Sequence, residues 1–331
     1  MFVRNILSFL SNVISISYKE EGILTKEKDL KNAFEKTMKK HKGNKKAQLI
    51  TIIVFAIIAI FSAFFGKDIV ENNLGNPTGN IEISYLDVGQ GDATYIRVND
   101  LDILIDAGPK SDSDKLMKQL EEKNIDDFEI VIATHPHEDH IGGMTKVFEK
   151  YDVKSFYMPK VTNTTKTFEN MMKAVSNEGL KVKVIKEGTS IDIGEGAKFE
   201  AYSPTKDTYD NFNDYSPIMK LTYGNKSFIF TGDAEKDVEK EVVKKYSNEL
   251  KADVIKFGHH GSSTSSTKEF VEAISPQYGI ISCGVDNSYG HPHREILDII
   301  KNMGIESYRT DKQGQITITS DGDTINIKTE K

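Results

Sequence analysis

Four side chains of the kinds that bind metal ions lie within six residues, in the segment THPHEDHIGG at residues 134–143. They are His135, His137, Asp139 and His140. The apolar run EIVIA before them predicts a buried strand, and residues 142–150 predict a helix. The segment is therefore expected at the C-terminal edge of a strand, where α/β folds place their functional sites. So many ligands beside a buried strand favour a metal site over a solvated loop with incidental histidines.

The single cysteine restricts what can hold such a metal. Cys283 excludes an internal disulfide and a Cys-rich zinc site, so histidines and carboxylates must provide the ligands. Cys283 itself ends a predicted strand and is expected to be a small buried apolar residue. The 331 residues are enough for one large domain or two ordinary ones, each with its own core.

An uncharged run extends from Ala47 to Phe65. At 1.5 Å per residue its helix would nearly span the roughly 30 Å hydrocarbon core, which predicts a transmembrane helix. A buried core helix is the alternative, but core helices of this length seldom lack a charged face. Six lysines precede the run and only Lys67 follows closely, so the N-terminus is expected in the cytoplasm and the C-terminal domain outside. The six are Lys36, Lys39, Lys40, Lys42, Lys45 and Lys46.

This prediction divides the chain into four parts. Residues 1–46 form a basic cytoplasmic segment, whose apolar start is compatible with an interfacial helix, a docking helix or disorder. Residues 47–65 form the membrane helix. Residues 66–80 form a linker, because they end in a stretch rich in Asn, Gly and Pro. Residues 81–331 form the folded domain.

The folded domain alternates short β-type runs with helical runs, and this pattern occurs twice. The first round contains the strands ISYLDV, ATYIRV, DILIDA and EIVIATH, with a helix at residues 112–123. The second begins at the hairpin KLTYGNKSFIFTGD and contains helices at residues 235–246 and 266–274. The strand YGIISC, a helix at residues 292–302 and the paired strands QITITS and TINIKT complete it. Two strand clusters separated by helices favour two sheets packed face to face, with helices outside.

Other predicted strands also end in polar side chains. FIFTGD ends in Asp233, and VIKFGHHGS carries His259 and His260. Asp233 alone could cap the helix that follows it, but beside two other ligand-bearing strand ends a bridge between two metals is the better interpretation. LIDAG similarly ends a strand with Asp106, for which a turn is the alternative.

The motifs YLDVGQGDA, LIDAG, THPHEDHIGG, FTGD and KFGHHGS occur in this order and resemble the metallo-β-lactamase superfamily, specifically its ComEC-like branch. The resemblance covers residues 81–331. It implies an αββα sandwich, here preceded by a single transmembrane helix, with two divalent metal ions, zinc or manganese, at one edge of the sheets.

The resemblance also implies roles for individual residues. His135 and His137 would bind one ion, and Asp139 and His140 the other. Asp233 would bridge them, and either His259 or His260 would complete the second site. Asp139 and Asp233 would be the catalytic carboxylates, with Asp139 orienting the nucleophile. Asp92 and Asp106, in the first two motifs, would support the site structurally.

Two features depart from the superfamily pattern. Many members supply another histidine shortly before the bridging aspartate, whereas NDYSPIMKLTYG, from Asn213, contains none. The first ion would therefore have fewer protein ligands. ComEC proteins also carry a channel of many helices, and one predicted span cannot by itself conduct DNA.

The segment SYGHPHRE provides candidates for substrate binding. His293 and Arg294, with His291, stand beside a predicted helix start, where they are suited to binding a phosphate. Alternatively, Pro292 is the first helical residue and the histidines frame a turn. Ser262 is suited to binding a substrate anion or to capping a helix.

The favoured function is a membrane-anchored, metal-dependent phosphodiesterase or nuclease that acts on DNA during uptake, with no protein partner indicated. From residue 80 onward, 31 Lys and Arg stand against 43 Asp and Glu, which disfavours a processive nuclease. The same motifs are similar to phosphorylcholine esterases of teichoic acid, so a cell-wall phosphodiesterase is the enzymatic alternative. A non-catalytic, metal-stabilised binding module is another, and a β-lactamase or lactonase is less favoured because the third histidine is missing.

Overall fold

The computed structural model describes residues 39–40 and 79–331. Of these, residues 79–331 belong to one compact unit. The predicted membrane helix at residues 47–65 lies outside the described residues, as do almost all of the predicted cytoplasmic segment and linker. Within the described part, no helix combines the length and the apolar character needed to cross a membrane.

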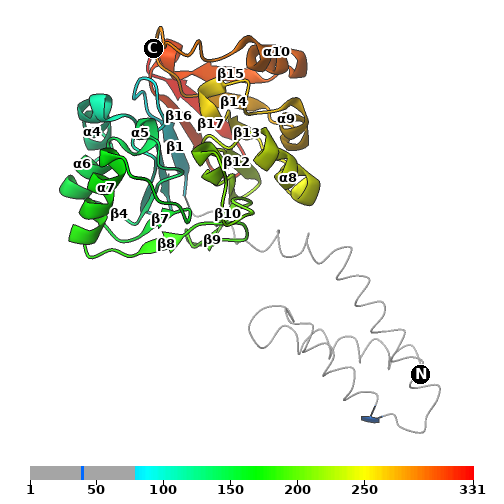
Figure 1. Ribbon diagram of the computed structural model, residues 1–331. Coiled ribbons are helices and arrows are strands. Elements are labelled where there is room, and N and C mark those ends of the chain that lie inside the picture. Colours follow the sequence, from blue (N-terminus) through cyan, green and yellow to red (C-terminus); the bar gives the residue numbers. More distant parts are fainter. Residues whose placement is uncertain (1–38, 41–78) are drawn as a thin grey trace. The chain divides into compact units, whose positions relative to one another are not determined.

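Two β-sheets form the centre of this unit (Figure 1). The first contains, in spatial order, β17 (Ile325–Thr329), β16 (Ile316–Ser320), β1 (Ile81–Tyr85), β2 (Thr94–Val98), β3 (Leu101–Ile105), β5 (Ile130–Ile132), β7 (Phe156–Met158) and β8 (Val182–Val184). The second contains β15 (Glu306–Arg309), β14 (Tyr278–Ile281), β13 (Val254–Lys256), β12 (Lys226–Phe230), β11 (Met219–Tyr223), β10 (Ala197–Ala201) and β9 (Ser190–Ile191). A small separate sheet pairs β4 (Asp127–Phe128) with β6 (Asp152–Val153).

Helices cover the outer face of each sheet, as Figure 1 shows. Outside the first sheet lie α4 (Ser113–Glu121), α6 (Met144–Lys150) and α7 (Lys166–Asn177), with the short α5 (Glu138–Ile141) at the sheet edge. Outside the second lie α8 (Lys236–Tyr246), α9 (Lys268–Ile274) and α10 (Arg294–Met303), and α11 (Thr310–Gln313) follows β15. Short 3-10 turns complete the chain at η1 (Lys110–Asp112), η2 (Phe212–Tyr215) and η3 (His259–Gly261). The four-layered αββα sandwich expected from the sequence is confirmed.

Three apolar cores hold these layers together. The central core lies between the sheets and draws on both, with buried residues such as Ile83, Ile132, Phe199 and Phe230. Each outer core packs helices on one sheet. The inner strands of both sheets are covered on both faces, so apolar residues dominate them. The edge strand β17 instead alternates partly buried and exposed residues.

Several local predictions are confirmed. Gly224 and Asn225 join β11 and β12 as a two-residue hairpin, with Tyr223 paired to Lys226. Gly224 has a φ of 57°, which glycine adopts without strain. The strands β16 and β17 pair antiparallel around Gly322, also as expected.

Two helix starts decide between alternatives that the sequence left open. Glu235 is the N-cap residue of α8, so Asp233 precedes the helix and does not cap it. His293 is the N-cap residue of α10, so Pro292 is not its first helical residue. In both cases the residues just before the helix form part of a loop next to the histidines described below.

The strand ends that carry the polar motifs meet at one edge of the sandwich. β5, β12 and β13 each end just before a ligand-bearing loop, and the loops after β1 and β3 pack between them. The loop after β1 lies so close to the first ligand loop that a Cβ on Gly91 would stand 2.4 Å from the carbonyl oxygen of Asp139. This glycine therefore permits the close contact of the two loops.

Candidate metal centre

The loop after β5 places three histidines and one aspartate around a common point. His135 Nε2 lies 2.9 Å from His137 Nδ1, and the rings of His135 and His140 have centroids 4.1 Å apart. His135 and His140 are fully buried, whereas the Asp139 side chain is 34% exposed. The loop thus turns two rings inward and leaves Asp139 facing solvent at the rim.

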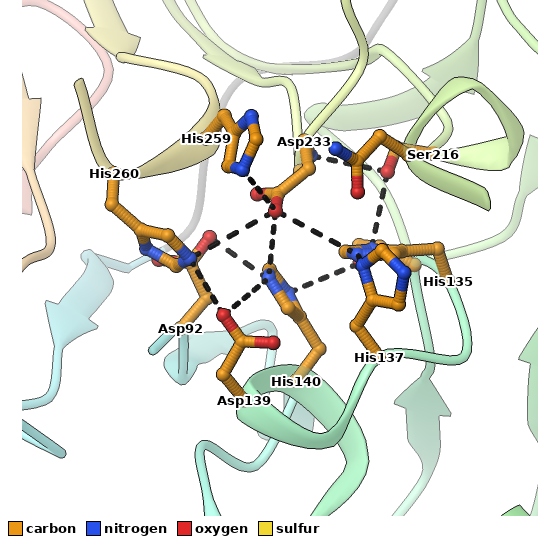
Figure 2. Close-up of polar contacts among 12 residues, drawn as sticks. Asp92, His135, His137, Asp139, His140, Ser216, Asp233, His259 and His260 are labelled. Atoms are coloured by element: carbon orange, nitrogen blue, oxygen red, sulfur yellow. Dashed lines mark hydrogen bonds and ion pairs between the residues drawn. The ribbon is translucent and has the colours of Figure 1, made fainter. Parts of the chain in front are cut away.

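One oxygen of Asp233 lies at the centre of this cluster, as Figure 2 shows. Asp233 Oδ2 is 3.2 Å from His140 Nε2 and 3.7 Å from His135 Nε2. It is also 3.8 Å from Nε2 of both His259 and His260. A single carboxylate oxygen therefore faces four imidazole nitrogens that come from two different strand ends.

Two groups of ligand atoms share this aspartate. His135, His137 and Asp233 form one group. Asp139, His140, Asp233 and His260 form the other. Within each group one ligand atom per residue lies within 4.8 Å of the others. This division is the one that the sequence motifs imply, with Asp233 common to both groups.

The structure distinguishes the two adjacent histidines. His260 is buried, and its Nε2 lies 3.1 Å from Asp139 Oδ2, so it belongs to the second group. His259 is partly exposed, and its Nδ1 lies 3.0 Å from the Thr264 hydroxyl. His260 is therefore the residue that completes the second group, and His259 lines the pocket beside it.

Hydrogen bonds at the far nitrogen fix the orientation of the buried rings. His140 Nδ1 lies 2.8 Å from Asp106 Oδ2, and Asp106 also accepts hydrogen bonds from the backbone and hydroxyl of Thr134. His260 Nδ1 lies 3.1 Å from the carbonyl oxygen of Ser282. An imidazole that donates from Nδ1 presents an unprotonated Nε2 to a metal, so both contacts favour metal binding. Asp106 thus has the supporting position expected for it.

Ser216 occupies the region where a third histidine was missing. Its Oγ accepts a hydrogen bond from the Asp233 backbone at 3.1 Å and lies 3.2 Å from His135 Nδ1 (Figure 2). The serine therefore holds the bridging aspartate and the first histidine together. Asn213, from the same segment, is buried and donates to Glu235.

A buried ion pair lies beneath the second group. Lys256 Nζ, at the end of β13, is 2.5 Å from Asp92 Oδ2, and both side chains are at most 4% exposed. Asp92 Oδ1 in turn lies 3.5 Å from His260 Nδ1. The position of Asp92 is the supporting one expected from its motif, whereas Lys256 was not expected at the site. A lysine within the apolar strand DVIKFG was the signal that marked it.

Electrostatics inside the cluster favour added positive charge. Burial lowers the pKa of His135 well below its ordinary value, and His140 adds to the effect, so this ring is neutral and able to bind metal. Burial would also lower the pKa of His260, but the carboxylates Asp233 and Asp92 raise it to about 10. The buried carboxylates thus stabilise positive charge on the groups next to them.

The residues present fit divalent metal ions. His140 Nε2 and Asp233 Oδ1 are buried and form no hydrogen bond of normal geometry within the described part. Atoms of this kind are costly to bury without a partner, and imidazole nitrogens with carboxylate oxygens are ligands that zinc and manganese accept. The third close group, Asp92, Asp106 and His140, uses the His140 nitrogen already bonded to Asp106 and is a supporting network.

A cavity of about 320 Å³ opens onto the cluster. Gln90 and His291 line it. The sequence had offered His291 as a candidate for binding a phosphate, whereas Gln90 was not singled out. Gln90 Oε1 accepts a hydrogen bond from the Gly284 backbone, which turns its amide nitrogen towards His291 Nδ1 at 3.4 Å. Burial and the neighbouring histidines lower the pKa of His291 to about 4, so the ring is neutral near pH 7. Because the Gln90 amide nitrogen can only donate, Nδ1 is the acceptor and Nε2 carries the ring proton.

The residues predicted to bind substrate lie farther from the cluster. Both ring nitrogens of His293 are engaged, with Ser263 and with the carbonyl oxygen of Tyr289. The Arg294 side chain is 88% exposed and pairs with Asp298 along α10. Ser262 is buried, and its hydroxyl contacts Thr264. None of these three residues lines the cavity, whereas His291, from the same segment as His293 and Arg294, does.

Known proteins resemble this chain over the same region. Residues 86–285 match the Metallo-beta-lactamase superfamily. ComE operon protein 3 of Bacillus subtilis is 32% identical over 71% of this chain and 32% of its own length. Competence protein ComA of Neisseria gonorrhoeae is 25% identical over 72% of this chain and 32% of its length. Exodeoxyribonuclease YycJ of Bacillus anthracis is 30% identical over 22% of this chain and 28% of its length.

The chain therefore belongs to the metallo-β-lactamase superfamily, with a hydrolase fold and a His/Asp cluster of the type that binds divalent metals. Within the superfamily it belongs to the ComEC-like competence branch. It spans about a third of the length of the two competence relatives.

Proposed function

We propose that this chain is a phosphodiesterase that uses two divalent metal ions, zinc or manganese, to hydrolyse DNA. The observation that carries the proposal is the position of Asp233, whose Oδ2 is shared by two groups of ligands. A shared carboxylate between two ligand groups is the arrangement expected of a dinuclear hydrolase centre. His135 and His137 would hold the first ion with Asp233, and Asp139, His140 and His260 the second.

When bound, two such ions would lower the pKa of a shared water and stabilise the charge that develops on a phosphoryl oxygen. The protein's own residues orient the reaction. The partly exposed Asp139 faces the cavity, where it can accept a proton from the attacking water. His291, held by Gln90, offers an Nε2–H that can donate a hydrogen bond to a phosphate oxygen.

Two observations support DNA as the substrate. The relatives include proteins named for competence and one named as an exodeoxyribonuclease. The cavity beside the cluster has a volume of about 320 Å³, which is enough to admit a phosphodiester group. The acidic surface argues for short-range binding at the site and against long tracking along a polyanion.

We further propose that residues 47–65 anchor the domain to a membrane, with residues 1–46 in the cytoplasm and the domain outside. The uncharged run and the excess of lysines before it support this topology. Protease treatment of intact cells tests it, because the domain should be digested while the basic segment is protected. A domain that resists digestion until the cells are opened would contradict the proposed topology.

Turnover of bis-p-nitrophenyl phosphate by the metal-loaded chain tests the enzymatic proposal. We expect hydrolysis in zinc or manganese, and a loss of more than about 100-fold in Asp233→Asn, because this change removes the shared ligand. Asp214→Asn is a matched control, since Asp214 is a nearby carboxylate outside both ligand groups. A chain that binds two ions and hydrolyses no phosphodiester would instead be a metal-stabilised binding module.

A substrate panel separates the enzymatic alternatives. Single-stranded DNA, double-stranded DNA, a cyclic dinucleotide and a choline-bearing phosphodiester are compared on wild type and on Asp139→Ala. Preferred cleavage of DNA supports the proposal. Preferred cleavage of the choline substrate would favour the cell-wall phosphodiesterase, and turnover of a chromogenic β-lactam alone would exclude both.

A further inference from the structure

Two exposed aromatic side chains lie next to histidines at the candidate metal centre: Phe212 contacts His137, and Tyr289 lines the cavity beside His291. Among the described residues, the large hydrophobic side chains that remain exposed are Val184, Phe212, Val285, Tyr289 and Leu297. Phe212, in η2, is 36% exposed and Tyr289, in the loop before α10, is 66% exposed. Exposed aromatic rings next to a functional site indicate contact with a ligand.

The two rings lie at opposite ends of one series of ring contacts. The Phe212 ring meets His137 edge to face, with centroids 6.0 Å apart, and the Tyr289 ring stacks on His291 at 5.6 Å and 22°. Between them the series passes through four histidines of the two ligand groups, in the order His137, His135, His140 and His260, and then through His291, which lines the cavity. Phe212 therefore lies beside the first ligand group, and Tyr289 lies beside the second group, separated from it by His291.

This separation indicates what kind of group they contact. A quaternary ammonium group, such as choline, is bound by several aromatic rings that surround one cation. Two rings on either side of a phosphodiester site instead suit a ligand with a planar group on each side of its phosphate. The nucleotides that flank a phosphodiester in DNA or RNA have this form, and bases stack on aromatic side chains without regard to sequence.

On this basis we infer that Phe212 and Tyr289 stack the two bases on either side of the scissile phosphate, and that the substrate is a single strand. The inference rests on the proposed phosphodiesterase function and adds the residues that select the substrate. In a duplex the base faces are covered by neighbouring bases, so stacking on the Phe212 and Tyr289 rings requires unpaired nucleotides.

A second cavity lies next to η2 and supports the passage of a polyanion on the Phe212 side. It has a volume of about 430 Å³ and is lined by Tyr215, whose ring is 6.4 Å from that of Phe212. Three lysines line it, together with two acidic residues: Lys160, Lys186 and Lys206, with Glu187 and Asp207. The net positive lining can contact the phosphates that follow the stacked base.

The test compares two oligonucleotides on the full chain, one with normal bases and one with abasic sites on both sides of the cleavable phosphate. For Phe212→Ala and Tyr289→Ala we expect kcat/KM on the normal single strand to fall roughly 5- to 100-fold, as expected for a lost base stack. Activity on the abasic strand should change less than about twofold. Phe212→Tyr and Tyr289→Phe should retain wild-type activity, because both keep the ring.

Leu297→Ala is the matched control, since Leu297 is exposed on α10 and does not line the cavity. It should behave as wild type on both strands. Equal losses on the normal and abasic strands, or no loss on either, would overturn the inference. So would preferred cleavage of duplex DNA or of a choline phosphodiester by the wild type.

Binding of the same strands, measured by fluorescence anisotropy, separates this inference from the proposed function. If the wild type hydrolyses nothing but binds the normal strand more tightly than the abasic one, and the alanine variants lose this difference, the stacking stands and the phosphodiesterase proposal fails. If the wild type hydrolyses both strands equally and binds them equally, the phosphodiesterase stands and the stacking fails.

Discussion

The ion pair between Lys256 and Asp92 lies beneath the metal centre and can be broken without touching a metal ligand. Lys256 Nζ is 2.5 Å from Asp92 Oδ2, with the two side chains 4% and 3% exposed. Burial alone would raise the pKa of the Asp92 carboxyl, but Lys256, His260 and His140 lower it to about 2. We predict that Lys256→Met strongly destabilises the fold, because it leaves a buried carboxylate without its main partner.

The magnitude follows from burial. Removing one partner of a buried pair costs about 3–5 kcal/mol. The fall in the pKa of Asp92 from 3.8 to about 2 corresponds to roughly 2 kcal/mol of net stabilisation, somewhat below that range, because the shift already includes the opposing cost of burial. Because the folded-state pKa is lowered, this contribution is present above about pH 4 and is lost as the pH falls towards 2.

Urea denaturation of the metal-free chain at pH 7 measures the effect. We expect the midpoint to fall by about 1–2 M, given a slope of about 3 kcal/mol per M. Lys226→Met is the matched control on the adjacent strand β12. Its partner Asp253 is 3.4 Å away and the two side chains are 23% and 26% exposed, so the loss should be about 0–1 kcal/mol.

A double variant completes a double-mutant cycle for this ion pair. Lys256→Met with Asp92→Asn should recover much of the lost stability, because no uncompensated charge remains. A loss in Lys256→Met no larger than in Lys226→Met would refute the reasoning, as would a double variant no more stable than Lys256→Met.

Three further predictions concern the centre and its loops. His137→Ala and His260→Ala should each lower the bound metal from two ions to one, as counted by elemental analysis; unchanged stoichiometry in both would contradict the two ligand groups. Asp106→Asn should weaken zinc binding about 10- to 100-fold in a competition titration, because Asp106 orients a ligand ring, and wild-type affinity would dismiss that role. Gly91→Ala should destabilise the fold by about 1–3 kcal/mol in thermal unfolding, whereas Gly79→Ala, with open space around it, should not. Equal melting temperatures of the two variants would argue against the close loop contact.

The candidate metal ligands were predictable because each follows a strand whose sequence is plainly apolar. EIVIA, FIFTG and VIKFG each precede a candidate ligand by at most two residues, and α/β folds bring such strand ends to one edge. The choice between His259 and His260 was not predictable. Both have positive φ, 49° and 57°, and this local backbone sends their rings to different neighbours.

Other features lacked a periodic signal. Between residues 151 and 196 the strands β6 and β9 have two residues each, which is too short for alternation to be recognised. Phe212 and Tyr289 are single aromatic residues outside regular helices and strands, so only their positions in the fold bring them next to the histidine cluster. His293 and Arg294 were predicted to bind substrate and follow His291 by two and three residues. They stand at the start of α10, which directs their side chains away from the cavity.

The central claim is that two metal ions bound around Asp233 hydrolyse a phosphodiester. Titration of manganese or zinc into the metal-free full chain, with bound ions and hydrolysis of bis-p-nitrophenyl phosphate followed in the same samples, tests this claim directly. We predict that two ions bind per chain and that hydrolysis rises with the second. Two bound ions without hydrolysis in either metal, or hydrolysis that persists when chelation has removed both, would contradict it.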